Sequence, residues 1–327
     1  MLVRGRGDIL SRVLQVILQT TYSVLYNKSM KLIAGSSNAS LAQSISTLLN
    51  TPLVTTEIST FQNGEKRVWI QEHIAGEDVI LIQSFSQPVD ENIIEFLLLA
   101  DAVQRLGAKN IHVIIPWMGY SLQDKVFLPG EPIAAKVIAN LVSNAGIDRV
   151  YLLDLHNSST PGFFSVPSVH LSAMELFAAD VRQRFPDADI VVASPDFGGL
   201  KRARQFATML GTELINVDKH RDLSTGEVTA VGLHGSVQGK TVLLFDDVIV
   251  SGGTVTEVAD LLKREGAAEA HFFATHGPLV PAALEKLEES SMDSITVTNS
   301  IAHKNLPQKL KVIDVGILFV HAIEEWL

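Results

Sequence analysis

Ten residues in the last third of the chain, 245–254, read FDDVIVSGGT and have the composition of a phosphate-binding loop. Asp246 and Asp247 follow an apolar run where a strand would end, and α/β proteins bind ligands at the carboxyl ends of strands. Gly252 and Gly253 allow backbone N–H groups to approach a phosphate closely, and the N-terminus of the next helix favours a dianion. Because carboxylates accept hydrogen bonds from sugar hydroxyls or from a metal-bound water, this loop predicts a sugar-phosphate site.

The same segment could instead be a turn followed by a capped helix, with solvated aspartates. A glycine pair alone would not decide between the two, because such pairs are common in turns. The full pattern, in which two aspartates end a strand and SGGT follows three residues later, is far more specific. We therefore favour the sugar-phosphate site, in which the hydroxyl groups of Ser251 and Thr254 are further donors.

Short apolar runs alternate with helical patterns from Met30 to the end of the chain. Most of these runs are continuous, which is typical of strands that are buried on both faces in parallel sheets covered by helices. Helical patterns cover 92–106, 132–145 and 254–265. The chain is therefore predicted to be an α/β protein built from βαβ units. The apolar runs are 32–35, 79–83, 111–116, 149–156, 189–196, 241–247, 270–277, 294–300 and 310–316.

Two segments, one beginning at Val79 and the other at Thr241, share one pattern. Each reads as a strand, a polar loop, a helix, a Gly-Ala pair and a second strand. Gly107 and Gly266 stand where a helix C-cap belongs. Only the second copy has the paired aspartates and the SGG sequence, so the first is expected to be a structural relative without this phosphate loop.

The repeated pattern predicts two similar α/β domains in tandem, 30–172 and 173–327. Because no segment rich in Pro, Gly or Ser separates them, we expect the two domains to pack tightly. Residues 1–29 differ in composition, with three arginines and one acidic residue. They are predicted to be an N-terminal extension outside the fold: an amphipathic helix, a transit peptide or the product of an upstream start codon.

The chain of 327 residues has a formal net charge of −10, and 46% of its residues are hydrophobic. An acidic chain without a run of Lys and Arg is a poor candidate for binding nucleic acid or an anionic membrane, so we expect neither partner. The absence of cysteine excludes disulfides, thiolate zinc sites and cysteine nucleophiles. It is consistent with a reducing cytoplasm, where we expect the protein to reside.

The loop at 245–254 resembles the ribose-phosphate loop of type I phosphoribosyltransferases and of ribose-phosphate pyrophosphokinases, the synthetases of phosphoribosyl pyrophosphate (PRPP). Further segments are similar to the second family in the same order, and the resemblance extends from Met30 to the C-terminus. It implies two tandem phosphoribosyltransferase-like domains, each a mainly parallel sheet flanked by helices. It also implies the transfer of diphosphate from ATP to the anomeric hydroxyl of ribose 5-phosphate, giving PRPP and AMP. The segments are FQNGE (61–65) with Arg67, IPWMGYSLQD (115–124), GEPIAAK (130–136), DLH (154–156), GFF (162–164), SPDFGGLKRAR (194–204) and VDKHR (217–221).

The resemblance also implies a role for each site residue. Lys219 and Arg221 would supply positive charge to the reacting phosphate, and we expect them to follow a strand at 214–218. His156 and Asp196 match positions that bind Mg²⁺ in the family. The implied ATP contacts are Phe61, Asn63, Glu65, Gln123 and Asp124. The implied ribose 5-phosphate contacts are Asp246, Asp247, Val250, Ser251, Gly252, Gly253 and Thr254.

Several of these residues also have simpler interpretations. Lys219 and Arg221 could be a solvated surface pair. On sequence grounds alone, Phe61 could be a core aromatic residue and His156 a hydrogen-bonded loop residue. Resemblance across the whole chain is what favours the functional roles.

Three features depart from the family pattern, and one of them is the segment 157–161 (NSSTP), which replaces a segment with longer side chains near His156. Leu122 stands where the family usually has arginine, and Val250 stands where many members have Asp or Thr. The departure at Leu122 leaves open a non-catalytic regulatory homologue, and the phosphate loop alone leaves open a type I phosphoribosyltransferase. Since family members are dimers or larger rings of dimers, the resemblance also implies a homo-oligomer, either a dimer or a hexamer.

Overall fold

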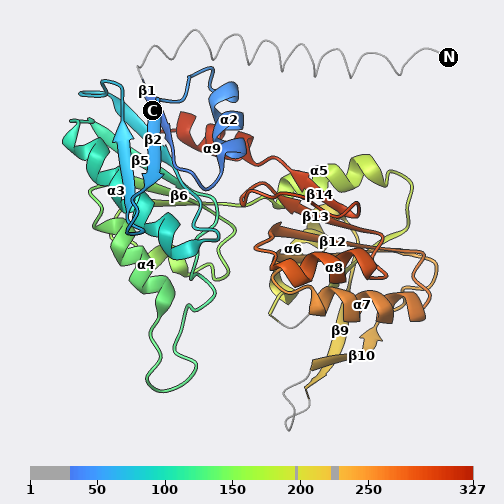
Figure 1. Ribbon diagram of the computed structural model, residues 1–327. Helices are drawn as coiled ribbons and strands as arrows, with labels where there is room; N and C mark the ends of the chain where they lie inside the picture. Colours follow the sequence, from blue (N-terminus) through green and yellow to red (C-terminus); the bar gives the residue numbers. More distant parts are fainter. Residues whose placement is uncertain (1–29, 196–197, 222–227, 327) are drawn as a thin grey trace, which may run out of the picture.

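The computed structural model describes residues 30–195, 198–221 and 228–326. Two mainly parallel sheets lie side by side, one formed by each half of the chain (Figure 1). The predicted extension, 1–29, lies outside the described residues. No helix among the described residues is long and apolar enough to cross a membrane.

The first half of the chain forms a sheet of five parallel strands. These are β1 (Met30–Ala34), β4 (Asp78–Ile82), β5 (Asn110–Ile115), β6 (Arg149–Leu153) and β7 (Ser168–Leu171), with helices α2 (Ala39–Leu48), α3 (Val89–Arg105) and α4 (Ala134–Ser143) and the short 3-10 helix η1 (Thr160–Phe163). The strand order is β1-β4-β5-β6-β7. All residues of β4 are buried, as a continuous apolar run predicts for a strand covered on both faces.

The second half of the chain forms a sheet of seven strands. These are β8 (Ile190–Ser194), β9 (Glu213–Arg221), β10 (Val228–His234), β11 (Thr241–Val248), β12 (Glu269–His276), β13 (Ser294–Thr298) and β14 (Leu310–Ile313), with helices α6 (Leu200–Leu210), α7 (Gly253–Arg264) and α8 (Pro281–Glu289). The order is β10-β9-β8-β11-β12-β13-β14, and only β9 and β10 pair antiparallel. The strand that ends in the two aspartates, β11, lies between β8 and β12 in the middle of the sheet.

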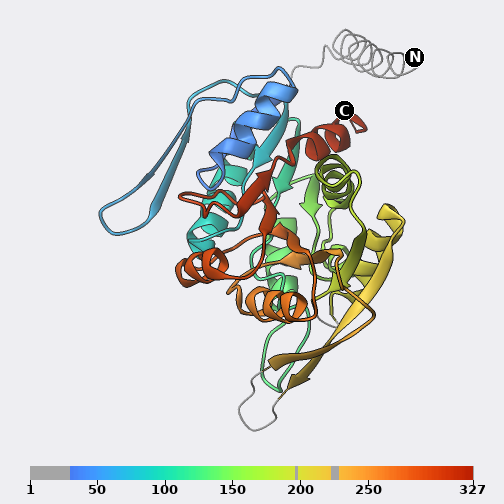
Figure 2. The ribbon, with the colours of Figure 1, turned by 90° about the vertical axis from the view of Figure 1, so that its right-hand side faces the viewer.

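Each half of the chain also has a β-hairpin that the apolar runs do not predict. In the first half, β2 (Thr56–Thr60) and β3 (Lys66–Ile70) form a separate two-stranded sheet, which projects from the body of the molecule (Figure 2). In the second half, β9 and β10 form the hairpin at the edge of the main sheet. The β2–β3 hairpin is largely exposed, and exposed polar positions leave little apolar pattern in a sequence.

Two helices pack away from the sheet that precedes them in the chain. Helix α5 (Met174–Arg184) follows the first sheet but contacts α6, and α9 (Gly316–Glu324) follows the second sheet but contacts α2 (Figure 1). Phe177 of α5 and Phe319 of α9 belong to a single hydrophobic cluster with residues of both sheets. The halves therefore share a core, which agrees with the tight packing expected from the missing linker. The domain boundary at 172/173 stays a prediction.

Both predicted helix C-caps are confirmed. Gly107 and Gly266 have φ of 79° and 86°, in the left-handed region that favours glycine. The N–H of each following residue, Ala108 or Ala267, bonds back across the last helical turn. The repeat seen in the sequence is therefore a repeat of backbone structure.

Candidate active site

The phosphate loop turns from β11 into α7 at the carboxyl edge of the second sheet. Gly252 has φ of 74°, and a Cβ atom there would lie 3.0 Å from Leu287 Cδ2, so the position favours glycine both conformationally and sterically. The α7 helix starts at Gly253 and has no side-chain cap, so backbone N–H groups of its first turn remain available. Ser251 and Thr254 are exposed beside this helix end. This geometry suits a dianionic phosphate.

Side chains from three elements meet at Asp246 and Asp247. His156 Nδ1 lies 2.6 Å from Asp247 Oδ2. Arg202 Nη2 donates to Asp246 Oδ1 at 2.9 Å and to Asp247 Oδ1 at 2.5 Å, while its Nη1 donates to the His156 carbonyl at 3.0 Å. Since His156 follows β6 of the first sheet and Arg202 lies on α6, the cluster joins the two halves of the molecule.

The two aspartates are shifted in opposite directions. Burial, with the charge of Asp247 beside it, raises the pKa of Asp246 to about 7. Burial also acts against ionisation of Asp247, but the hydrogen bond with His156 and the charge of Arg202 outweigh it and lower that pKa. The same hydrogen bond raises the pKa of His156. A cation at this site would favour the charged form of Asp246.

Asp154 supports the cluster from the first sheet, as its position two residues before His156 suggests. Its φ is 33°, and Oδ2 accepts hydrogen bonds from Ala173 N at 2.9 Å and Thr275 Oγ1 at 2.6 Å. Next to it, His276 Nε2 lies 3.1 Å from the Leu153 carbonyl. These contacts fix the end of β6 against the end of β12, and so hold the His156 segment beside the phosphate loop.

The predicted nucleotide residues fall into two groups. Asp124 lies beside the His156 segment, since its Oδ2 accepts a hydrogen bond from Asn157 Nδ2 at 2.5 Å. Next to it, Gln123 accepts a hydrogen bond at its carbonyl from Ala135 N at 3.1 Å.

The second group lies at the tip of the β2–β3 hairpin. Phe61 is 52% exposed there, which rules out the core interpretation, and Asn63 Nδ2 donates to Glu65 Oε2 at 2.9 Å. Within the described residues, no hydrogen bond or ion pair joins this tip to the aspartate cluster.

The structure corrects the position predicted for Lys219 and Arg221. Lys219 and Arg221 were expected after a strand at 214–218, but β9 continues to Arg221, and both residues lie within it. The reason is β10, which pairs with β9 and satisfies its backbone groups, so the polar sequence remains extended. The side chains of both residues, and Asp196, lie outside the described part of the structure.

Arg202 contacts both aspartates but was not among the site residues predicted from the sequence. It stands inside the family-like segment at 194–204, but nothing in its spacing singles it out from Lys201 or Arg204. The signal would have been its place in the first turn of α6, which starts at Leu200 beside β11. A basic side chain at that point can reach the carboxylates that end the neighbouring strand.

A metal site is only partly built from the described residues. Within them, no group of three or more His, Asp or Glu side chains is arranged to hold a metal ion. The carboxylates of Asp246 and Asp247 are suitable donors for a hard cation, and an imidazole such as that of His156 is a less usual one. The donor set therefore fits Mg²⁺ in its chemistry, with Asp196 as the further carboxylate that the sequence predicts.

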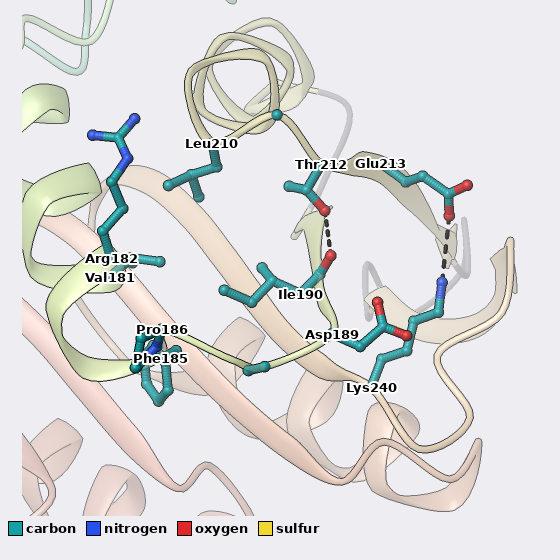
Figure 3. A pocket seen from close by; sticks show the side chains of 12 residues that line it. Val181, Arg182, Phe185, Pro186, Asp189, Ile190, Leu210, Thr212, Glu213 and Lys240 are labelled. Atoms are coloured by element: carbon teal, nitrogen blue, oxygen red, sulfur yellow. Dashed lines mark hydrogen bonds and ion pairs between the residues drawn. The ribbon is translucent and has the colours of Figure 1, made fainter. Parts of the chain in front are cut away.

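A groove with a volume of about 600 Å³ lies elsewhere, at the opposite edge of the second sheet (Figure 3). Lys240 and Glu213 form an ion pair of 3.4 Å across it. Its other walls come from the C-terminal ends of α5 and α6, among them Val181, Phe185 and Leu210. Because α/β enzymes place substrates at the carboxyl ends of their strands, this groove is not the reaction site.

Comparisons with known proteins agree with this arrangement. A family model described as the N-terminal domain of ribose phosphate pyrophosphokinase matches residues 30–146, and one described as the phosphoribosyl synthetase-associated domain matches 215–326. The chain is 40% identical over 300 residues to a ribose-phosphate pyrophosphokinase of Thermotoga maritima, covering 91% of this chain and 95% of the relative. The corresponding enzyme of Fusobacterium nucleatum is 39% identical, covering 90% of this chain and 94% of its own. A crystal structure of phosphoribosylpyrophosphate synthetase from Mycobacterium smegmatis superposes with a TM-score of 0.84 at 32% identity, covering 90% of this chain and 98% of that chain.

Proposed function

This chain belongs to the ribose-phosphate pyrophosphokinase family and is a ribose-phosphate diphosphokinase by homology, and we propose that it converts ATP and ribose 5-phosphate to PRPP and AMP. The anomeric hydroxyl of the sugar attacks the β-phosphorus of ATP, the bond from that phosphorus to the α-phosphate oxygen breaks, and AMP leaves. The chain then contributes to nucleotide biosynthesis. We place it in the cytoplasm, consistent with a chain that has no cysteine.

The acceptor half of the site is the phosphate loop. The 5-phosphate binds to backbone N–H groups of the loop and of the first turn of α7, with the hydroxyls of Ser251 and Thr254 as further donors. Val250, which is 37% exposed, contributes through its backbone. Asp246 and Asp247 accept hydrogen bonds from the ribose hydroxyls, and Arg202 balances their charge.

The donor half needs positive charge around the transferred diphosphate. Lys219 and Arg221 supply it, because phosphoryl-type transfer is accelerated mainly by positioning and by electrostatic stabilisation of the equatorial oxygens. Mg²⁺, held by His156 and Asp196, would neutralise phosphate charge on ATP. The ATP contacts are Phe61, Asn63, Glu65, Gln123 and Asp124.

We also propose a homo-oligomer, a dimer or a hexamer. In the described part of this chain, no hydrogen bond or ion pair joins the hairpin tip with Phe61 to the aspartate cluster, and the hairpin projects from the body (Figure 2). In a homo-oligomer, a nucleotide could contact the hairpin and the cluster without both coming from one chain.

One observation supports the proposal above the others. His156 and Arg202 come from different halves of the chain, and both contact the aspartate pair of the phosphate loop. The test is incubation of the purified protein with Mg²⁺, ATP and ribose 5-phosphate, with separation of the nucleotides and detection of PRPP. We expect AMP and PRPP in equal amounts, and no AMP beyond background when the sugar phosphate is omitted. AMP at the ATP-only level would contradict the proposal and favour a non-catalytic homologue.

A further inference from the structure

We propose that Lys66 is a positioning residue for ATP: it fixes the β2–β3 hairpin to helix α3 through Glu91 and Glu95, and thereby holds the nucleotide-binding tip in place. The inference rests on the proposed role of Phe61 and Glu65 as nucleotide contacts. It adds a residue that touches neither ATP nor ribose 5-phosphate.

The hairpin depends on its attachment to the body. A two-stranded hairpin alone is marginally stable in water. Lys66 pairs with Thr60 in the last rung of the β2–β3 ladder, and the tip is then closed by the hydrogen bond from Phe61 N to the Glu65 carbonyl at 2.8 Å. Whatever orients Lys66 therefore orients the tip that follows it.

Lys66 turns its charge toward α3. Its Nζ lies 3.1 Å from Glu91 Oε2 and 3.5 Å from Glu95 Oε2, and its side chain is only 14% exposed. Phe61, by contrast, is 52% exposed. The ammonium group is thus paired with two carboxylates of α3. The tip residues are then the ones left to contact the ligand.

Glu95 connects this ion pair to the centre of the first sheet. Its side chain is fully buried and accepts hydrogen bonds from Ser36 N at 2.6 Å, Ser36 Oγ at 2.7 Å and Gln83 Nε2 at 3.0 Å. Ser36 follows β1 and Gln83 follows β4, so the hairpin is attached to the carboxyl ends of two strands. The partners from β1 and β4 are neutral, and a buried carboxylate that loses its cation is strongly destabilising.

A direct contact between Lys66 and the phosphates of ATP is the competing explanation. The two differ in what Glu91 does. If Lys66 positions the hairpin, removal of the Glu91 charge loosens the anchor and weakens ATP binding. If Lys66 binds phosphate, the same change frees its ammonium group and strengthens ATP binding.

The experiment compares Lys66→Met, Lys66→Arg and Glu91→Gln by steady-state kinetics. Glu91 is 57% exposed, so its variant should fold even if Lys66→Met does not. We expect KM for ATP to rise roughly tenfold in Lys66→Met and severalfold in Glu91→Gln, with kcat and KM for ribose 5-phosphate changed less than about twofold, the pattern of lost ground-state binding. Lys66→Arg should restore most of the affinity for ATP.

Lys31→Met is the matched control. Lys31 pairs with Glu72 at 3.7 Å near the base of the same hairpin, but both side chains are about one-third exposed. Such a surface pair contributes little, so the variant should keep a normal KM for ATP. An unchanged KM for ATP in Lys66→Met, a lowered one in Glu91→Gln, or an equal rise in Lys31→Met overturns the proposal.

A measurement that does not depend on catalysis distinguishes failure of this proposal from failure of the proposed function. Trp69 lies on β3 and is 50% exposed, so in a chain with Trp117→Phe and Trp326→Phe its fluorescence anisotropy reports on the hairpin alone. Lys66→Met and Glu91→Gln should lower this anisotropy, and Lys31→Met should not. Unchanged anisotropy in both anchor variants contradicts the proposal even if the enzyme proves inactive.

Discussion

The two halves of this protein use the same backbone frame around different loops. In the first half, Gly76 N donates to the carbonyl of Gly107, and in the second half Gly239 N donates to that of Gly266, both at 2.8 Å. Each pair joins the start of a central strand to the end of the helix that follows it. The same strand, helix and glycine pair therefore form in both halves, with or without a proposed ligand site. We expect functional differences to lie in the loop between strand and helix.

The loops differ in whether their polar groups are satisfied internally. In the first half, Gln83 and Ser84 are fully buried, and Gln83 bonds to the buried Glu95. Two acidic residues, Asp90 and Glu91, lie in the first turn of α3 and complement its positive end. A phosphate would be repelled there.

In the second half, the first turn of α7 contains no acidic residue, and a glycine with positive φ precedes it. The helix N-terminus is thus left for a ligand, and the aspartates face His156 and Arg202. The proposed phosphate loop thus differs from its counterpart in two ways that favour an anion: it has glycines, and its helix end has no acidic side chains.

The largest expected difference between the two halves comes from substituting two glycines with similar φ, one in each half. Gly252 and Gly76 have φ of 74° and 77°, so alanine at either position should cost about 1–2 kcal/mol in backbone strain. Only Gly252→Ala disturbs the phosphate loop, and we expect its kcat/KM for ribose 5-phosphate to fall roughly 30-fold, corresponding to about 2 kcal/mol. Gly76→Ala should have normal kinetics. Equal losses in both variants, measured by kinetics and urea unfolding, would show that the effect is one of stability.

A smaller effect is expected from Arg202→Met. The guanidinium balances two largely buried carboxylates, so its loss leaves them mutually repulsive and mispositioned for the ribose. We expect KM for ribose 5-phosphate to rise roughly tenfold.

The control for Arg202 is Arg105→Met in the first half. Arg105 forms an exposed i,i+4 pair with Asp101 at 2.7 Å, which contributes little. If Arg202→Met retained a normal KM for the sugar phosphate, the arginine would have no part in the acceptor site.

The sequence predicted the buried part of this architecture and missed the exposed part. Nine strands appear as continuous apolar runs because helices cover both faces of their sheets. The hairpin strand β3 reads KRVWI, which has no long apolar run, and β9 was predicted only over 214–218 but continues through Lys219 to Arg221. Such segments become strands because the other strand of the hairpin supplies their hydrogen bonds, and this pairing requires no long apolar run in the sequence.

The packing of α9 on the first half of the chain was equally hidden. The apolar sequence of α9, GILFVHAIE, predicts burial but does not say against which sheet. The phosphate loop could be proposed from the sequence because glycine and aspartate have specific backbone and charge roles. Arg202 was not evident, because its partners lie 44 and 45 residues away in the sequence.

The smallest expected effect concerns two buried histidines at equivalent positions, His112 and His271. Burial lowers the pKa of both, so the folded protein keeps them neutral while the unfolded chain binds protons near its pKa of 6.5. Their stabilisation is thus complete above pH 6.5 and is lost as the pH falls below that value. At pH 5.5, each should cost at most about 1.4 kcal/mol.

Urea unfolding at pH 7.5 and 5.5 measures this loss. The double variant with His112→Gln and His271→Gln should lose less stability on acidification than the unmodified chain does. An identical pH dependence in the two proteins would assign acid sensitivity to other groups.

The most direct test of the whole account is the turnover of Lys219→Ala beside that of His220→Ala. In the proposed reaction Lys219 supplies charge to the transferred diphosphate, and its neighbour His220 is given no role. With Mg²⁺, ATP and ribose 5-phosphate at saturation, AMP formation should fall by about 10²-fold or more in the lysine variant. The histidine variant should remain near the rate of the unmodified protein. A lysine variant with near-normal turnover would contradict the account.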